Sequence, residues 1–333
     1  MEKISVIIPC RNEAKYIFDT VSSVIKQKNV SNNIEIIVVD GMSEDGTFEI
    51  VYKMMQKDQR IILLKNEKKN TPVALNIGIK KASGDFILIL GAHARIDEFY
   101  ISSCTKIFNK YNDVDCAGGP INSIGNGNLS KAIAITMSSP IGVGNAKHRF
   151  PEYEGYAEMA CFPMYKSEVF TKIGMFDEEL IRNQDDDFSF RLRLKGGKIF
   201  ISPEAKSYYF VRDNLKKLFE QYFGYGYWRI ALLKKHKLSI SFRHQIPFLF
   251  FSIVILLLIT GIYFDRLIIS VIVPIIYITA LIIFTILEAI NTRKFLIVLL
   301  PVVAFVLHFS YALGFLSGLL QFIPFLKKFK FKT

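Results

Sequence analysis

The chain has 333 residues, of which 51% are hydrophobic, and it carries a formal net charge of +12. That hydrophobic share is close to the share in soluble proteins, so the average alone excludes no class. The distribution does exclude a uniformly soluble protein, because charges are interspersed up to about residue 245 and the stretch 246–326 is almost continuously apolar. The length is typical of about two domains, and we place a boundary near residue 245.

Short apolar runs alternate with helix-like stretches over the first 120 residues. The runs expected as strands are 4–8, 34–39, 61–64 and 86–90. Helices are expected over about 12–28, 46–57 and 72–82. Runs rich in β-branched residues that alternate with helices are typical of a parallel sheet covered on both faces. The sequence therefore predicts an α/β fold with an open, mostly parallel sheet.

Polar residues follow these runs where open parallel sheets bind ligands, at the carboxyl ends of the strands. Arg11 and Glu13 follow the first run, Asp40 the second and His93 the fourth. The sequence contains neither GxGxxG after the first run nor GxxxxGK[ST] anywhere. This absence disfavours a dinucleotide-binding fold and a P-loop enzyme.

The region 115–210 is less regular and carries an acidic cluster, 183–187, ahead of a helix-like stretch. The four cysteines show no CxxC or metal-ligand spacing. The N-terminal MEKISVIIPCRNE resembles a strand and a polar turn more than a signal peptide. We therefore expect the first domain to lie in the cytosol, with reduced thiols.

The apolar block predicts membrane spans. Two runs, 246–264 and 267–287, are separated only by Asp265 and Arg266 and are typical of a tight transmembrane hairpin. A third span is expected over about 296–320. A cytosolic first domain would place Arg293 and Lys294 inside, as the positive-inside tendency favours, but a third full span would place the tail lysines outside. A re-entrant or interfacial third segment therefore stays open as an alternative.

Basic residues flank this block on both sides, which favours an anionic membrane surface over nucleic acid as the partner. A solvated basic face is the alternative. We expect a multi-pass protein of the inner (cytoplasmic) cell membrane with its first domain in the cytosol. The predicted divisions are an α/β domain at 1–211, a basic amphipathic interfacial segment at 212–245, a membrane domain at 246–326 and a basic tail at 327–333.

Four stretches occur in this order along the chain: ISVIIPCRNE, EIIVVDGMSEDGT, ALNIGIKKASGDFILIL and NQDDDFSFRLRLKGG. Together they resemble family 2 glycosyltransferases, which have a glycosyltransferase-A type fold and usually invert the sugar. The resemblance covers about residues 3–245 and implies that the domain at 1–211 is a cytosolic nucleotide-sugar glycosyltransferase domain. The succinoglycan-biosynthesis branch is the closer likeness, through GAHARID, SSPIGVGNAKHR, QYFGYGYWR and HFSYALGFLSG.

The resemblance implies roles for individual residues. Asp40 would hydrogen-bond a uracil-type base, with the Ser43–Thr47 turn as support, and Asp185 would be the catalytic base. The implied nucleotide-binding residues are Pro9, Arg11, Glu13, Asp40, Asn76 and Ala92. The residues implied for the acceptor side and the diphosphate pocket are Gln221, Trp228 and Arg229. Asp187 and Arg191 would be structural supports.

The chain departs from the family at the DXD motif, which falls on Gly91-Ala92-His93. The resemblance implies a divalent cation, Mn²⁺ or Mg²⁺, with His93 as the metal residue. Imidazole suits Mn²⁺-like ions better than Mg²⁺. Because Gly91 removes the first carboxylate, metal dependence and activity both stay open.

Each of these residues also has a plain structural interpretation. Asp40 would then cap the next helix, and the acidic cluster would be a negative first turn favoured by the helix dipole. His93 would be a structural histidine. The 221–229 stretch would be an amphipathic interfacial helix and nothing more.

Together these features predict a membrane-anchored inverting glycosyltransferase. It would move a sugar from a nucleotide-diphosphate donor, UDP-linked by preference, to a lipid-linked or nascent saccharide in surface polysaccharide synthesis. The alternative is an inactive transferase-like membrane partner that binds nucleotide, for which Gly91 is the reason. A transporter is disfavoured because His308 is the one candidate polar group within the apolar helices. Nucleic acid is not expected as a partner.

Overall fold

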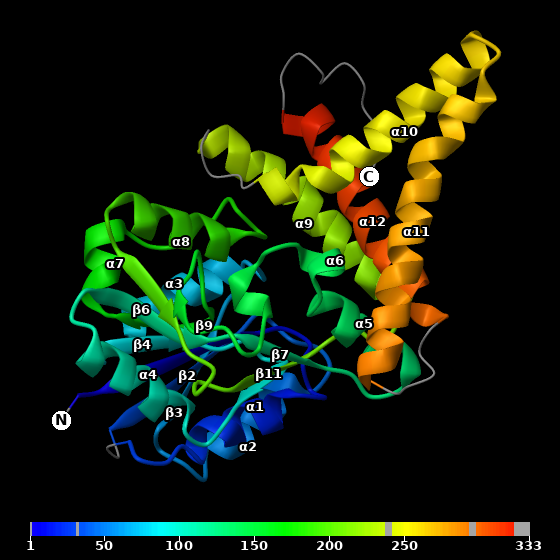
Figure 1. Ribbon diagram of the computed structural model, residues 1–333. Coiled ribbons are helices and arrows are strands. Elements are labelled where there is room, and N and C mark those ends of the chain that lie inside the picture. The colour runs from blue at the N-terminus through cyan, green and yellow to red at the C-terminus, as the bar shows by residue number, and fades with distance from the viewer. Residues whose placement is uncertain (1, 31–32, 237–241, 293–297, 323–333) are drawn as a thin grey trace. The chain divides into compact units, whose positions relative to one another are not determined.

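The computed structural model describes residues 2–30, 33–236, 242–292 and 298–322. The chain divides into two compact units (Figure 1). The first unit contains Met1–Asn122 and Lys147–Phe210, and the second contains Ser123–Ala146 and Val211–Thr333. The second unit thus includes an internal segment that the predicted division at residue 211 leaves in the first domain. The predicted tail at 327–333, and Arg293 and Lys294, lie outside the described residues.

The first unit is built on an eight-stranded mixed sheet with strand order β3-β2-β1-β4-β9-β6-β10-β8. Its strands are β1 (Ile4–Cys10), β2 (Ile34–Asp40), β3 (Ile61–Lys65), β4 (Phe86–Ile89), β6 (Val114–Gly119), β8 (Gly155–Tyr156), β9 (Cys161–Lys166) and β10 (Lys198–Ile201). β9 is antiparallel to both β4 and β6, so β1, β2, β3, β4, β6 and β10 all run in one direction. The predicted open, mostly parallel α/β sheet is confirmed.

Alternate residues of the central strands build the two cores, because successive strand side chains point to opposite faces. On one face, Val6 and Ile8 pack in a cluster with Val21 of α1 and Ile101 of α4. On the other face, Ile7 packs in a cluster with residues of α3, α7 and α8. The covering helices are α1 (Ile17–Ile25), α2 (Thr47–Met55), α3 (Thr71–Lys81), α4 (Tyr100–Lys110), α7 (Glu168–Ile173) and α8 (Gln184–Leu194). A second sheet joins β5 (Ala94–Ile96), β11 (Ser207–Phe210) and β7 (Ile121–Ile124).

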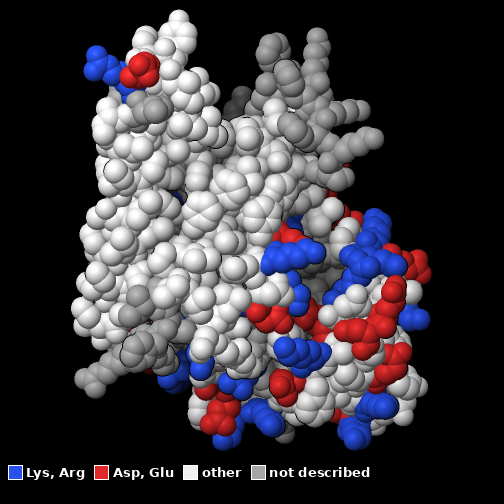
Figure 2. Space-filling model, turned by 90° about the vertical axis from the view of Figure 1, so that its right-hand side faces the viewer, with Lys and Arg blue, Asp and Glu red and all other residues white. Residues whose placement is uncertain are grey.

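The second unit is helical. Its helices are α5 (Asn128–Met137), α6 (Pro140–Val143), α9 (Leu215–Lys235), α10 (Ile246–Tyr263), α11 (Leu267–Thr292) and α12 (Leu299–Phe322). Within the described residues, three segments are long and apolar enough to cross a membrane: Ile246–Tyr263, Ser270–Ile290 and Leu299–Phe322. Figure 2 shows the surface of these helices as almost entirely uncharged, with charged atoms where α10 turns into α11. α10 is the most exposed of the three and α12 is half buried.

Glycines allow α9 and α12 to pack backbone against backbone. A Cβ atom added at Gly226 of α9 would lie 2.1 Å from the Tyr311 carbonyl oxygen, and one at Gly314 of α12 would lie 2.0 Å from the Phe223 oxygen. Gly314 and Gly318 are spaced as in the GxxxG motif, by which helices approach closely inside membranes. α9 is therefore built into the second unit through its contact with α12.

A histidine inside α12 joins three elements of the second unit. His308 Nε2 lies 2.7 Å from the Ile141 carbonyl oxygen of α6, and Nδ1 lies 2.8 Å from the Tyr277 hydroxyl of α11. A carbonyl can only accept, so Nε2 donates, and the Tyr277 hydroxyl donates to Nδ1. This neutral tautomer ties α6 to the apolar helices.

The glycine contacts predict that Gly314→Ala destabilises the second unit. The added methyl group would meet backbone atoms of α9, and overpacking typically costs about 1–3 kcal/mol. We expect a lower thermal unfolding midpoint for the detergent-solubilised protein. Leu316→Ala, on the exposed side of α12, is the control and should unfold close to wild type. Equal midpoints for both variants would contradict this packing.

Candidate functional site

The common direction of the strands brings several loops to one edge of the main sheet. Cys10 and Asp40, the last residues of β1 and β2, are direct partners in the ladder. The same edge holds the residues that follow β4. Because β9 is antiparallel, its first residue, Cys161, lies at this edge too, opposite Gly119 at the end of β6. The loops predicted to bind a nucleotide therefore meet at one edge, as parallel strands require.

The loop after β1 is held by the turn after β2. Asn12 donates its backbone N–H to Ser43 Oγ at 2.9 Å, and its side-chain oxygen accepts from Glu44 N at 2.9 Å. Glu13 N donates to Thr47 Oγ1 at 2.8 Å. Asn12 adopts a left-handed backbone, φ 55°, a conformation that asparagine tolerates better than most residues. These bonds hold the two loops as one structure.

Asp40 is buried, with 2% exposure, and anchors the turn that follows it. Its Oδ2 accepts from Ser43 N at 3.0 Å and its Oδ1 accepts from the Ser43 hydroxyl at 2.5 Å. Burial, and to a lesser extent the Asp40 carboxylate, raises the pKa of the Cys10 thiol. Helix α2 has Gly46 at its N-cap, so Asp40 is not the cap of that helix.

Glu13 and His93 form a pair that the sequence did not indicate. His93 Nδ1 lies 3.0 Å from Glu13 Oε1, and the two side chains are 24% and 20% exposed. The Thr20 hydroxyl lies within hydrogen-bond distance of the carbonyl oxygens of Ala92 (2.8 Å) and Ala94 (2.7 Å), which fixes the chain on both sides of His93. A histidine that binds a metal through one ring nitrogen usually donates its other ring N–H to a carboxylate or a similar acceptor, which orients the ring.

The residues present fit a cation only in part. Within the described residues no group of three or more His, Cys, Asp or Glu side chains is placed to hold a metal. His93 can supply one nitrogen ligand through Nε2, and Glu13 is placed to orient it. Oxygens of a bound diphosphate and water would have to complete the coordination shell.

Gly91 faces an aromatic ring. A Cβ atom added there would lie 3.4 Å from Phe162 Cε1. Phe162 has a positive φ of 47°, which is strained for a bulky residue and is held in place by its surroundings. The fully buried Tyr100 directs its hydroxyl at the Phe162 carbonyl (2.7 Å) and the Cys161 carbonyl (3.0 Å). Sequence reasoning missed Phe162, because no local pattern marks it.

Asp185 lies in the first turn of α8 and its side chain is exposed. Its Oδ1 accepts from Asp186 N at 2.9 Å. The carboxylate is near β9, since it adds to the rise in the pKa of Cys161, to about 11, which burial mainly causes. By contrast, Asp187 is fully buried and accepts from Arg191 Nε at 2.8 Å. Of these two aspartates, Asp185 is exposed and Asp187 is buried in an ion pair.

Three further residues predicted to bind the nucleotide, Pro9, Arg11 and Asn76, lie in different parts of the first unit. Pro9 is part of β1, and the Arg11 side chain packs beside Gly41. The Asn76 amide is buried and joins α3 to a later loop, because it donates to the Phe176 carbonyl at 2.9 Å and accepts from Phe176 N at 3.0 Å. Its predicted role toward a nucleotide stays a prediction.

Three predicted residues belong to α9 of the second unit. Gln221 and Arg229 are buried, with 4% and 6% exposure, and Gln221 Nε2 donates to the Tyr225 hydroxyl at 3.0 Å. The Trp228 ring contacts Tyr227 and Phe322, at centroid distances of 5.6 and 5.9 Å. α9 therefore contributes buried polar groups to the second unit.

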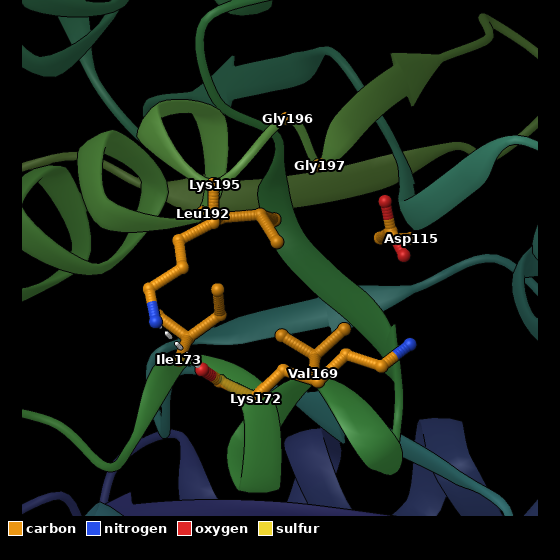
Figure 3. Close-up of a pocket in the computed structure, with 8 residues that line it drawn as sticks. All are labelled: Asp115, Val169, Lys172, Ile173, Leu192, Lys195, Gly196 and Gly197. Atoms are coloured by element: carbon orange, nitrogen blue, oxygen red, sulfur yellow. Dashed lines mark hydrogen bonds between the residues drawn. The ribbon is translucent and has the colours of Figure 1, made fainter.

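A separate pocket lies at the opposite end of the strands. Figure 3 shows it between α7, α8 and the starts of β6 and β10, with Lys172, Lys195 and Asp115 among its lining residues. Asp115 Oδ2 accepts from Lys198 N, the first residue of β10, at 3.0 Å. The pocket is therefore at the amino-terminal edge, away from the predicted site residues.

Comparisons with known proteins identify the family of this chain. The family profile described as glycosyl transferase family 2 matches residues 5–174. A dolichyl N-acetyl-α-D-glucosaminyl phosphate 3-β-D-2,3-diacetamido-2,3-dideoxy-β-D-glucuronosyltransferase from Methanococcus voltae is 30% identical over 329 residues, 96% of this chain and 98% of its own. The succinoglycan biosynthesis protein ExoA of Rhizobium meliloti is 28% identical over 246 residues, 73% of each chain.

A solved structure supports the same fold. The mannosyltransferase PcManGT from Pyrobaculum calidifontis, in complex with GDP-Man and Mn²⁺, superposes with a TM-score of 0.64 over 95% of this chain and 87% of its own, at 15% identity. At that identity the likeness concerns the fold alone, and it confirms the predicted glycosyltransferase-A type. The profile match and the near full-length relative identify the chain as a member of glycosyl transferase family 2, a glycosyltransferase with three apolar helices that can span a membrane.

Proposed function

We propose that this glycosyltransferase transfers a sugar, with inversion, from a UDP-linked donor to a lipid-linked saccharide at the cytosolic face of the inner membrane. The observation that carries the proposal is the gathering of the Asp40 turn, the Glu13–His93 pair and the residues after β4 at one sheet edge. Asp185 begins a helix near the same edge. The edge thus combines a nucleotide cradle with an exposed carboxylate.

The donor would lie across the linked loops. Asp40 would orient the turn that meets the base, while Pro9, Arg11 and Glu13 form the wall of the loop after β1. Ala92 would act through its backbone, which the Thr20 hydroxyl holds in place by donating to the Ala92 carbonyl. Asn76 would act by positioning the loop at Phe176. Gln221, Trp228 and Arg229 would shape the acceptor side and the diphosphate pocket.

Asp185 would act as the general base in a single displacement. The acceptor hydroxyl oxygen forms a bond to the anomeric carbon as the bond from that carbon to the diphosphate oxygen breaks, and the hydroxyl proton moves to the Asp185 carboxylate. The exposure of this carboxylate supports the role, whereas Asp187 is committed to Arg191.

A divalent cation would be held by His93 Nε2, with Glu13 fixing the ring through Nδ1. When bound, the cation would offset the charge on the leaving diphosphate. We expect Mn²⁺ in preference to Mg²⁺, because imidazole is a poor ligand for Mg²⁺. The oriented histidine would compensate in part for the carboxylate that Gly91 lacks.

The acceptor assignment rests on the relatives and on the apolar helices. The Methanococcus relative is named for a dolichyl-phosphate-linked acceptor and the Rhizobium relative for succinoglycan. Three helices suited to span a membrane support a multi-pass anchor beside such lipids. We propose a catalytic domain within 1–211, from which the segment 123–146 joins the helical unit, an interfacial segment at 212–245 and a membrane domain at 246–326, with a basic tail at 327–333.

An inactive nucleotide-binding partner is the second candidate, favoured by one observation. Gly91 removes the first DXD carboxylate, and the Phe162 ring lies beside the position that it would occupy. This candidate predicts nucleotide binding without turnover.

The first test is UDP release from a panel of UDP-sugars, with a lipid-saccharide extract and Mn²⁺. Asp185→Asn should reduce turnover about 10²–10⁴-fold, the usual contribution of general acid–base catalysis. Asp186→Asn, the neighbouring carboxylate, is the matched control and should stay within about threefold of wild type, because removing it leaves that contribution intact. UDP binding without release from any donor would favour the inactive partner.

The second test concerns the cation. In the presence of UDP, His93→Gln and Glu13→Gln should each weaken Mn²⁺ binding, Glu13→Gln by about 10–100-fold as for other residues that orient a metal ligand. Electron paramagnetic resonance of bound Mn²⁺ measures this without turnover. Glu44→Gln, an exposed carboxylate of the adjoining turn, should bind Mn²⁺ as wild type does. Unchanged binding in Glu13→Gln would refute the orienting role.

A further inference from the structure

A cluster of basic side chains of the second unit lies at the start of α10. Arg243 and His244 belong to a short 3-10 helix, Phe242–His244, that directly precedes α10. Arg229 of α9 is close enough to lower the pKa of His244, more strongly than Arg243 does, although burial is the main cause. Three basic residues from two elements of the second unit therefore converge.

The hydrogen bonds of Arg243 fix its position. Its Nη1 donates to Asn145 Oδ1 at 3.1 Å, and its Nε donates to His244 Nε2 at 3.4 Å. Its side chain also passes beside Gly144, where an added Cβ atom would lie 3.5 Å from Arg243 Cβ. The guanidinium is thus held by the loop after α6, and the imidazole is held by the guanidinium.

The His244 ring then presents a donor for which the described part of the chain offers no acceptor. Nε2 accepts from Arg243, so the neutral ring carries its proton on Nδ1. Burial keeps the ring neutral, because it lowers the pKa of His244 to about 2. Nδ1 is shielded from solvent and has no hydrogen-bond partner within the described residues. A buried N–H calls for an acceptor, and beside arginines the acceptor of matching charge is an anion.

The position of this basic cluster, next to the first candidate membrane span, indicates which class of anion would bind there. His244 is two residues before Ile246, where the first candidate span begins. Along α10, Ile246, Leu249 and Ile253 expose their apolar side chains, at 50%, 38% and 47%. A ligand with a phosphate at one end and a hydrocarbon chain at the other satisfies both features. Arginine forks bind phosphate oxygens in pairs.

We propose that Arg243, His244 and Arg229 form the site for the phosphate of the polyisoprenyl-phosphate acceptor lipid, whose hydrocarbon chain lies along α10. The inference rests on the proposed function, because it assigns the lipid end of that acceptor. Of the two roles that the proposed function gives to Arg229, it selects the acceptor side: the ligand of Arg229 is the phosphate that anchors the acceptor and not the diphosphate that leaves the donor.

The single tryptophan of the chain, Trp228, gives a direct binding signal because it precedes Arg229 in α9. The experiment titrates a polyisoprenyl phosphate into the full-length protein in phosphatidylcholine nanodiscs and follows Trp228 emission. Wild type should give a saturable change. Arg243→Gln and His244→Phe should weaken the apparent affinity at least tenfold.

Arg266→Gln is the matched control, since it removes one arginine from the exposed turn at the other end of α10. It should bind like wild type. If Arg243→Gln fails to fold, Arg243→Lys replaces it. That variant keeps the charge but loses the fork, so its affinity for the lipid should fall below that of wild type, and affinity equal to wild type would overturn the proposal.

Competitors separate the sources of phosphate. The unphosphorylated polyisoprenol, inorganic phosphate and phosphatidylglycerol should not reproduce the saturable change, and UDP should not displace the lipid. Equal binding of the alcohol, equal competition by either phosphate, or displacement by UDP would each overturn the proposal. If the lipid binds through Arg243 while no UDP-sugar turns over, the proposed function fails and this site stands. If a UDP-sugar turns over while lipid binding does not depend on Arg243, the proposed function stands and this site fails.

Discussion

The backbone ladder between β1 and β2 is the interaction on which the nucleotide edge depends. Its register pairs Cys10 with Asp40, so the loops that leave these strands start side by side. The Asn12, Ser43 and Glu44 hydrogen bonds can form only because of that alignment. A shift by one residue would turn the buried side chains of these strands to the opposite face. The cores and the site are therefore positioned by the same hydrogen bonds.

The second unit is organised by close packing instead of a sheet. Small residues let α9 and α12 touch along their backbones, as small residues do where helices pack closely in membrane proteins. His308 adds polar contacts to α6 and α11, and its neutral tautomer satisfies both ring nitrogens. The internal segment 123–146 thereby becomes part of the helical unit.

Two buried or half-buried histidines show how the same side chain serves different ends. His93 Nδ1 meets a carboxylate, so the neutral ring has its lone pair on Nε2. His244 Nε2 meets an arginine, so the neutral ring carries its N–H at Nδ1. In each case the first hydrogen-bond partner decides which ring nitrogen carries the proton.

The sequence by itself determined the α/β class, the glycosyltransferase family and the apolar block, because these depend on local periodicity, ordered motifs and long uncharged runs. It also named Asp40 and His93 as candidates, since each follows an expected strand, and Asp185 through the family resemblance. Only the tertiary structure paired Glu13 with His93, set Phe162 beside Gly91 and brought Arg229 toward His244. Those partners are far apart in the chain, and their meeting depends on strand order and helix packing, which no local pattern encodes.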